Sequence, residues 1–204
     1  MTGGSKPLRA DLRIIADWIP RGARVLDLGC GDGQLLAHLQ ADKQVSGYGL
    51  EIDPDNVVAS IGAGVNVLQL DLDDGLGQFE DNSFDVVVMA SALQQVQQPD
   101  ELIREMLRIG GQGIVTFPNF GHWRPRLSIA WHGLMPVSKA LPNQWYDTPN
   151  IHLCTVRDFE KLCASNHIRV TQRHVVNHEH ASSLRTRVFP NLLGEIALYQ
   201  LERG

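Results

Sequence analysis

Cysteine is scarce in this chain, and its spacing excludes two common kinds of site. The three cysteines are Cys30, Cys154 and Cys163, an odd number with no CxxC pair among them. Such a set provides neither a disulfide framework nor a recognisable zinc motif. We therefore expect reduced thiols in a cytoplasmic protein.

The chain also lacks long runs of basic residues and long runs of apolar residues. There is no long basic run, and the net charge is −5, so nothing favours binding to nucleic acid or to an anionic membrane. Residues 1–20 hold no apolar stretch suited to a signal peptide, and no stretch approaches the length that spans a bilayer. With 204 residues, 43% of them hydrophobic, the chain suits a single domain with one sizeable core.

The sequence does contain an alternation of helix-like and strand-like segments. Apolar residues at helical spacing predict a first helix that ends at Pro20, and Thr155 with Asp158 resembles a capping box. Helices are predicted over residues 8–19, after Gly33, and over 101–109 and 155–164. Strands are predicted over residues 24–28, 44–53, 65–74, 83–90, 113–117, 168–176 and 192–201. This order indicates an α/β fold with a doubly wound, mostly parallel seven-stranded sheet and helices on both faces.

Polar residues stand at or just beyond the ends of several predicted strands. In doubly wound sheets, ligands bind beyond the carboxyl ends of the strands, where the strand order reverses. Because the strand assignments are independent of one another, their agreement predicts one binding rim. The rim residues are Asp27, Gly29, Gly31, Gly33, Glu51, Asp71 and Ser91.

The stretch from Asp27 to Gly33 has the pattern D-x-G-x-G-x-G, which differs from the G-x-G-x-x-G of dinucleotide-binding proteins. A carboxylate at Asp27 would repel a pyrophosphate but attract an ammonium group. The helix that begins beyond Gly31 offers N–H groups to an anion such as a carboxylate. Both features fit the amino-acid end of a ligand.

The second and third strands end in acids that suit a nucleoside. Glu51 is placed to accept hydrogen bonds from ribose hydroxyls and would repel a 2′-phosphate, while Asp71 and the N–H of Leu72 suit an adenine edge. Amino acid, ribose and adenine together describe S-adenosylmethionine. The alternative, a doubly wound domain that keeps the turn without the ligand, leaves these acids unexplained. The predicted cofactor residues are Asp27, Gly29, Cys30, Gly31, Gly33, Glu51, Ile52, Asp71, Leu72 and Ser91.

Four motifs in this order, VLDLGCGDG, GYGLEID, LDLDD and FDVVV, resemble class I S-adenosylmethionine-dependent methyltransferases. This resemblance covers the chain as far as the fifth predicted strand. It implies that Asp27 orients the methionine ammonium, that Glu51 binds ribose and that Asp71 meets adenine.

Three longer stretches extend the resemblance over nearly the whole chain. GLEIDPDNV, SALQQVQQPDELIREMLRIG and the aromatic-rich run from FPNFGHW to NIHLCT are similar to the MetW family of methionine-biosynthesis proteins. This similarity implies a bacterial cytosolic protein that binds S-adenosylmethionine or S-adenosylhomocysteine. It also implies homoserine O-acetyltransferase as a partner whose activity the chain supports or regulates, and it implies no methyl acceptor.

The catalytic machinery is left open by the sequence. Methyl transfer needs positioning and, for a weak nucleophile, a base. Many small-molecule methyltransferases of this fold carry histidines after the fourth strand, where this chain has Gln94 and Gln95, which accept no proton. His122, Tyr146 and His152 are candidate bases or donors, although each also has a structural interpretation. The alternative function is therefore methyl transfer to an unidentified small molecule.

Residues 118–154, here called the aromatic segment, form a long insertion or lid between a strand and a helix. Its tryptophans, tyrosine and arginines are types enriched at protein interfaces, and they would also suit a substrate pocket. We expect the acetyltransferase to bind here. The residues concerned are Trp123, Arg124, Arg126, Trp131, Trp145 and Tyr146.

A histidine-rich stretch, HVVNHEH, invites a test for metal binding. On a strand, His178 and His180 would share a face. No cysteine or paired acid completes a tetrahedral set with His174 and these two. The stretch is better interpreted as a solvated strand end, and we expect no metal.

Overall fold

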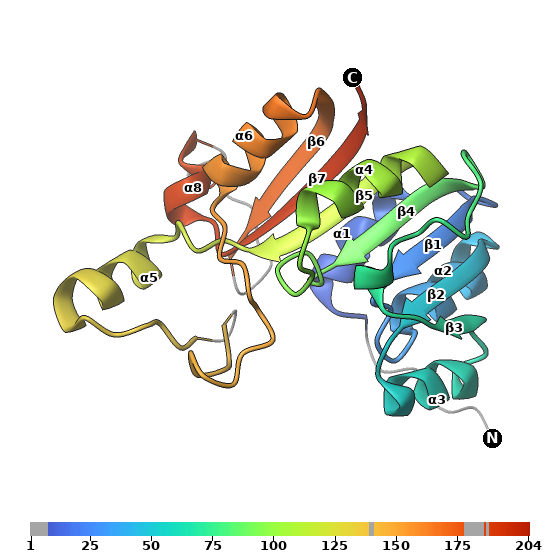
Figure 1. The fold of residues 1–204 in the computed structure, drawn as a ribbon, viewed down its shortest axis with the longest axis horizontal. Coiled ribbons are helices and arrows are strands. Elements are labelled where there is room, and N and C mark those ends of the chain that lie inside the picture. Colours follow the sequence, from blue (N-terminus) through green and yellow to red (C-terminus); the bar gives the residue numbers. More distant parts are fainter. Residues whose placement is uncertain (1–7, 139–140, 178–185, 187) are drawn as a thin grey trace.

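The computed structural model describes residues 8–138, 141–177, 186 and 188–204, and its centre is a seven-stranded sheet of order β3-β2-β1-β4-β5-β7-β6 (Figure 1). Strands β1 to β5 pair in parallel, whereas β7 is antiparallel to both β5 and β6. The predicted mostly parallel sheet is confirmed. The strands are β1 Arg24–Leu28, β2 Ser46–Glu51, β3 Val67–Gln69, β4 Phe84–Ala90, β5 Gly110–Pro118, β6 Ile168–Val176 and β7 Ile196–Arg203.

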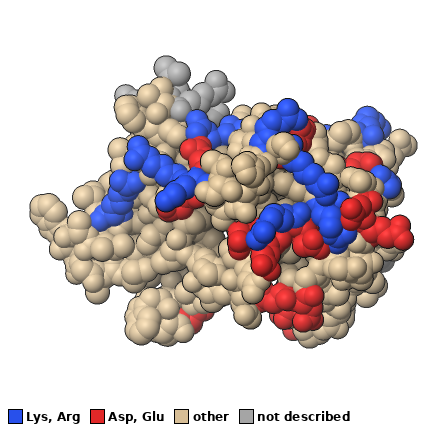
Figure 2. All heavy atoms as spheres, turned by 45° about the horizontal axis from the view of Figure 1, so that its top comes forward, with Lys and Arg blue, Asp and Glu red and all other residues tan. Residues whose placement is uncertain are grey.

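The aromatic segment leaves the sheet at the end of β5 and projects from the body, on the side away from β2 and β3 (Figure 1). It contains α5 (Trp123–Leu127) and one π-helical turn, η2 (Ser128–His132), and its described residues from 141 to 154 form turns and irregular chain. Figure 2 shows few charged side chains at the lower left of the face it draws, on the side to which the segment projects. Trp131 is 83% exposed, and Trp145 and Tyr146 are each 71% exposed.

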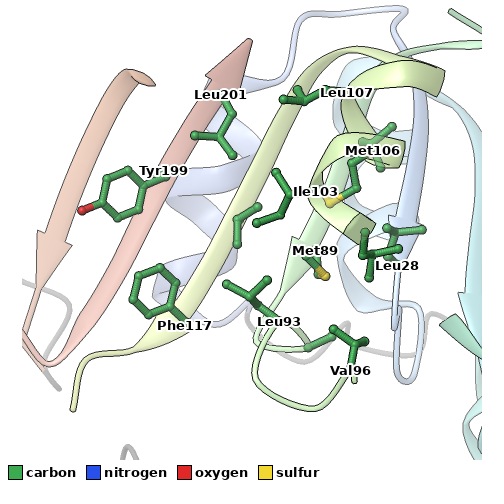
Figure 3. Packing of buried hydrophobic residues seen from close by; sticks show 14 of the residues in the cluster. Leu28, Met89, Leu93, Val96, Ile103, Met106, Leu107, Phe117, Tyr199 and Leu201 are labelled. Carbon is green, nitrogen blue, oxygen red and sulfur yellow. The ribbon is translucent and has the colours of Figure 1, made fainter. Parts of the chain in front are cut away.

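Helices cover both faces of the sheet, as predicted. Helices α1 (Ala10–Trp18) and α2 (Gln34–Lys43) pack on one face, and α4 (Pro99–Ile109) and α6 (Val156–Ser165) pack on the other. Successive residues of a strand point to opposite faces. Val88 of β4 therefore packs with the α1 and α2 side, whereas Met89 packs against Ile103 and Met106 of α4 (Figure 3).

The longest helix missing from the prediction is α3 (Pro54–Gly62). Its local signals are clear, because Asp53 accepts hydrogen bonds from the backbone N–H groups of Asp55 and Asn56, and proline follows at the first helical position. The predicted cap of α6 is confirmed as a full capping box. Thr155 Oγ1 accepts from the N–H of Asp158 at 3.2 Å, and Asp158 accepts from the N–H of Thr155 at 3.0 Å.

Three strand predictions extended more than one residue beyond the observed strands. The second, over residues 44–53, corresponds to β2 at Ser46–Glu51. The third strand ends at Gln69, because Asp71 accepts a hydrogen bond from the N–H of Asp73 and starts a 3-10 turn, η1 (Leu72–Asp74). The last strand starts only at Ile196, and Leu192 and Leu193 instead belong to the short helix α8 (Pro190–Leu193). Asn119 Nδ2 holds this turn by donating to the carbonyls of Asn191 and Gly194.

No helix among the described residues is both long and apolar enough to cross a membrane.

Candidate functional site

The chain turns sharply after β1, at the centre of the carboxyl edge of the sheet. Because β1 lies between β2 and β4, this turn stands where the strand order reverses. Gly29 has a φ of +69°, and a Cβ there would lie 3.1 Å from the Cβ of Ala92. Gly33 begins α2 with a φ of +74°, and a Cβ there would lie 2.8 Å from Ser60 Oγ. The turn therefore needs glycine for both conformation and space.

Two hollows meet at this turn and share Gly29 and Ala90 in their walls. The smaller one, of about 250 Å³, lies over Asp27 and the start of α2, and we call it the amino-acid hollow. The larger one, of about 530 Å³, lies between Glu51, Asp71 and the loop after β4, and we call it the nucleoside hollow. Every residue predicted to bind the cofactor lines one of the two except Gly33, which shapes the start of α2.

Asp27 is the buried acid of the amino-acid hollow. Its residue is 2% exposed, and Oδ1 has no hydrogen-bond partner among the described residues. Burial, and to a lesser extent the neighbouring Glu51, raises the pKa of Asp27 to about 7. A buried carboxylate without a partner is unfavourable, so a bound cation would stabilise it.

Glu51, at the end of β2, is a backbone acceptor as well as a candidate ligand. Its Oε2 accepts from the N–H of Gly31 at 2.8 Å, and Oε1 accepts from Ile52 and Asp53 at 2.9 Å each. The N–H of Gly31 is therefore engaged by protein. Since each carboxylate oxygen can accept more than one hydrogen bond, Glu51 retains capacity for a ligand in the nucleoside hollow.

The other walls of the nucleoside hollow come from the ends of β3 and β4. Asp71 is half-buried and holds the η1 turn that carries Leu72. Ser91 has a φ of +68°, an uncommon conformation for a residue with a side chain, and its N–H donates to the backbone and side chain of Thr116. The structure thus brings the three predicted acids, Asp27, Glu51 and Asp71, to one rim.

Sequence reasoning missed Arg9 and Leu12, which line the amino-acid hollow from the start of the chain. Asp11 accepts from Nε and Nη2 of Arg9 at 3.2 and 2.9 Å, which orients the guanidinium. No motif contains these residues. The helical spacing predicted α1, but only the packing of α1 beside the glycine turn places them at the site.

The candidate catalytic residues do not converge on one point. His122 is 4% exposed, with Nε2 3.9 Å from Glu195 Oε1, and lines a third hollow of about 390 Å³ at the base of the aromatic segment. Tyr146 stands in solvent. His152 Nε2 lies 3.1 Å from the carbonyl of Gln97. Among the described residues, neither hollow of the predicted cofactor site is lined by any of the three.

The glutamines after β4 have different surroundings. Gln94 is 2% exposed and contacts both ends of the aromatic segment, whereas Gln95 lines the nucleoside hollow and donates to the carbonyl of Ser91. Neither amide can act as a base.

The histidine-rich stretch is only partly described. His174 packs edge-on against Trp18, with ring centroids 5.8 Å apart, while His178 and His180 lie outside the described residues. Within the part of the chain that the structure covers, no group of three or more histidine, cysteine, aspartate or glutamate side chains is placed to hold a metal.

Comparison with solved structures places this geometry among known folds. The chain is similar to an S-adenosylmethionine-dependent methyltransferase from Mesorhizobium loti, with a TM-score of 0.70 and 18% identity over 96% of this chain and 98% of that one. At this identity the likeness establishes the fold. The chain therefore has the class I methyltransferase fold.

Sequence comparisons narrow the assignment. The chain is 26% identical over 143 residues to norajmaline N-methyltransferase of Rauvolfia serpentina, covering 66% of this chain and 48% of that protein. It is 32% identical over 205 residues to the bifunctional methionine biosynthesis protein MetXA/MetW of Rhodopirellula baltica, covering 96% of this chain but only 33% of that protein. The family model for methionine biosynthesis protein MetW matches residues 9–201. This chain belongs to the MetW family of methionine biosynthesis proteins.

Proposed function

We propose that the chain binds S-adenosylmethionine or S-adenosylhomocysteine across the two hollows and acts by docking on homoserine O-acetyltransferase in the cytoplasm. The observation that carries the ligand part is Asp27, a buried carboxylate whose Oδ1 has no partner among the described residues. Free cysteine thiols at all three positions are compatible with a reducing compartment.

The amino-acid hollow suits a zwitterion. Asp27 would accept hydrogen bonds from the ligand's ammonium group, and Arg9 would hold its carboxylate. Arg9 retains N–H groups for this role, because the described contacts with Asp11 use only Nε and one N–H of Nη2. Charge complementarity at both ends therefore supports an amino-acid moiety.

The nucleoside hollow suits the remainder of the ligand. Glu51 would accept from ribose hydroxyls, and Asp71 with the N–H of Leu72 would contact adenine. Ile52 is 57% exposed at the mouth and provides an apolar surface for the base. Bound S-adenosylmethionine would supply a sulfonium methyl group, and among the described residues none of the candidate bases His122, Tyr146 and His152 lines either hollow.

The aromatic segment is the proposed docking surface. From Ser128 to Cys154 the sequence has only two formally charged residues, Lys139 and Asp147. Trp131 and Trp145 are exposed, and tryptophan is a residue type enriched at the binding hot spots of protein interfaces. In Rhodopirellula baltica, one polypeptide carries the joint name MetXA/MetW, and such a chain holds two modules at high effective concentration. Both observations support association with the acetyltransferase.

The deciding experiment is the rate of homoserine acetylation by the cognate acetyltransferase, with and without this protein and S-adenosylmethionine. We expect a changed rate on addition of the protein, and loss of the change in the W131S/W145S variant. Val58→Ser is the matched control, because Val58 is 69% exposed on α3, outside the aromatic segment. An unchanged rate, together with no complex at micromolar concentration, would reject the docking role.

A second candidate function is methyl transfer to a small molecule. It is favoured by the third hollow, of about 390 Å³, where His122, Arg124 and Glu195 meet at the end of β5. Formation of S-adenosylhomocysteine with a panel of small acceptors would support it, provided that His122→Gln removes turnover but retains ligand binding. If no acceptor is methylated but the rate of the acetyltransferase changes, the methyl-transfer function is rejected and the docking function is supported.

A further inference from the structure

The loop after β4, residues 91–98, forms part of the nucleoside hollow. Ala92, Gln95 and Val96 line the hollow from this side. The N–H of Gln97 donates to Asp73 Oδ1 at 2.8 Å, and Asp73 belongs to the η1 turn that lines the same hollow. A ligand in the nucleoside hollow would therefore contact both the loop after β4 and the η1 turn, which this hydrogen bond joins.

The same loop also holds both ends of the aromatic segment. The carbonyl of Gln94 accepts from the N–H groups of Ile151 at 2.8 Å and His152 at 3.0 Å. Its side-chain Nε2 donates to the carbonyl of Pro118 at 3.1 Å and lies 3.4 Å from Cys154 Sγ. Pro118 and Cys154 are the first and last residues of the segment. One residue thus contacts both of its ends.

Two features of this loop are energetically unfavourable in the arrangement observed. Its first residue, Ser91, has a φ of +68°, and such strain in a residue with a side chain persists only where the surroundings enforce it. Gln94 Oε1 is buried without a hydrogen-bond partner among the described residues. The loop therefore gains from any rearrangement that satisfies these groups, and a ligand that contacts its wall can favour one arrangement over another.

We propose that Gln94 is a positioning residue that couples the nucleoside hollow to the aromatic segment. A nucleoside-bearing ligand in the hollow thereby orders the segment and changes its affinity for a partner protein. This inference rests on the proposed function and adds its regulation. By linkage, the partner must change the affinity for the ligand by the same factor.

Hydrogen exchange of the intact chain tests the coupling without the partner. With saturating S-adenosylhomocysteine, we expect exchange at Phe120 and at residues 151–154 to slow by about fivefold or more, the lower end of coupling between sites. Gln94→Met keeps the length of the side chain but removes its amide. We expect this variant to lose most of the slowing at Phe120, whose N–H donates to Cys154 beside the amide, and less at Ile151 and His152, which donate to the backbone carbonyl of residue 94. Its Kd for the ligand should stay within about twofold of the wild-type value.

Gln98→Met is the matched control, since Gln98 is exposed in the same loop and makes no side-chain capping bond at the start of α4. On addition of the ligand, hydrogen exchange in this variant should slow as much as in the wild type. Ligand binding without slowing, or equal slowing at Phe120 in Gln94→Met and wild type, would overturn the coupling but leave the proposed ligand intact. Absence of any binding would overturn both.

If Gln94→Met does not fold, the wild-type chain still decides. Calorimetry then measures two factors. One is the factor by which S-adenosylhomocysteine changes the Kd between this chain and the acetyltransferase, and the other is the factor by which the acetyltransferase changes the Kd between this chain and S-adenosylhomocysteine. A factor indistinguishable from one in both directions would overturn the coupling.

Discussion

Glu51 Oε2 accepts a hydrogen bond of 2.8 Å from the backbone N–H of Gly31, joining the end of β2 to the turn after β1. The other carboxylate oxygen binds the N–H groups of Ile52 and Asp53. One acid therefore shapes the rim on which it stands, and a change at Glu51 affects both the scaffold and the ligand.

We expect Glu51→Ala to weaken binding of S-adenosylhomocysteine by about 1–3 kcal/mol, because hydrogen bonds to a charged group are lost. It should also lower the free energy of unfolding, since three backbone N–H groups lose their acceptor. Glu51→Gln retains one acceptor oxygen and should be milder in both respects. Titration calorimetry and urea unfolding measure the effects, with the exposed Asp55→Asn as control. An unchanged Kd would refute the ribose role.

Asp27 predicts a distinctive dependence of stability on pH. Its folded pKa, raised by burial to about 7, exceeds the ordinary value near 3.9, so the folded state binds more protons between these values. The free energy of unfolding should therefore fall as pH rises from about 4 to 7, by about 4 kcal/mol at most. Asp27→Asn lacks this contribution and should exceed the wild type in stability at pH 8. Parallel pH profiles for the two proteins would contradict the assignment.

The same carboxyl makes ligand binding depend on pH. An ammonium group prefers the ionised form of Asp27, so affinity for S-adenosylhomocysteine should rise between pH 6 and 8. In Asp27→Asn the affinity should be lower and nearly independent of pH over this range. A rise of equal size in the variant would assign the titration to another group.

Arg9 predicts selectivity for the amino-acid end of the ligand. Arg9→Gln should weaken S-adenosylhomocysteine binding by about fivefold or more, as a charged hydrogen bond is lost. Binding of 5′-methylthioadenosine, which lacks the amino-acid moiety, should not change. Arg13→Gln, at an exposed position on the same helix, is the control. Equal weakening of both ligands would point to a structural role of Arg9.

The capping box of α6 predicts an effect on stability alone. Thr155→Ala should lower the free energy of unfolding by about 0.5–2 kcal/mol, because the N–H of Asp158 loses its acceptor. Ser165→Ala, exposed in the last turn of the same helix, should change little. Chemical unfolding measures both, and a cost for Ser165→Ala as large as that for Thr155→Ala would contradict the cap's role.

Local patterns predicted much of the site. Apolar runs and the alternation of apolar and polar residues indicate where the strands end. At or just after those ends stand the acids at 27, 51 and 71 and the glycines between 29 and 33. Helix α3 also has a local signal, Asp53 followed by proline, and its omission was avoidable. The early end of β3 is harder to foresee, because one side-chain hydrogen bond at Asp71 overrides an apolar pattern that continues to Leu72.

The sequence by itself determined the strand order along the chain, the glycine turn, the acids on the rim and the membership of a family. Those features depend on capping, conformational freedom and periodicity, which act over a few residues. Only the tertiary structure decided that Arg9 and Asp27 line the same hollow, that Glu51 accepts a hydrogen bond from Gly31, and that Gln94 contacts both ends of the aromatic segment. These contacts join residues far apart in the chain, and they depend on how helices and strands pack, which no short stretch encodes.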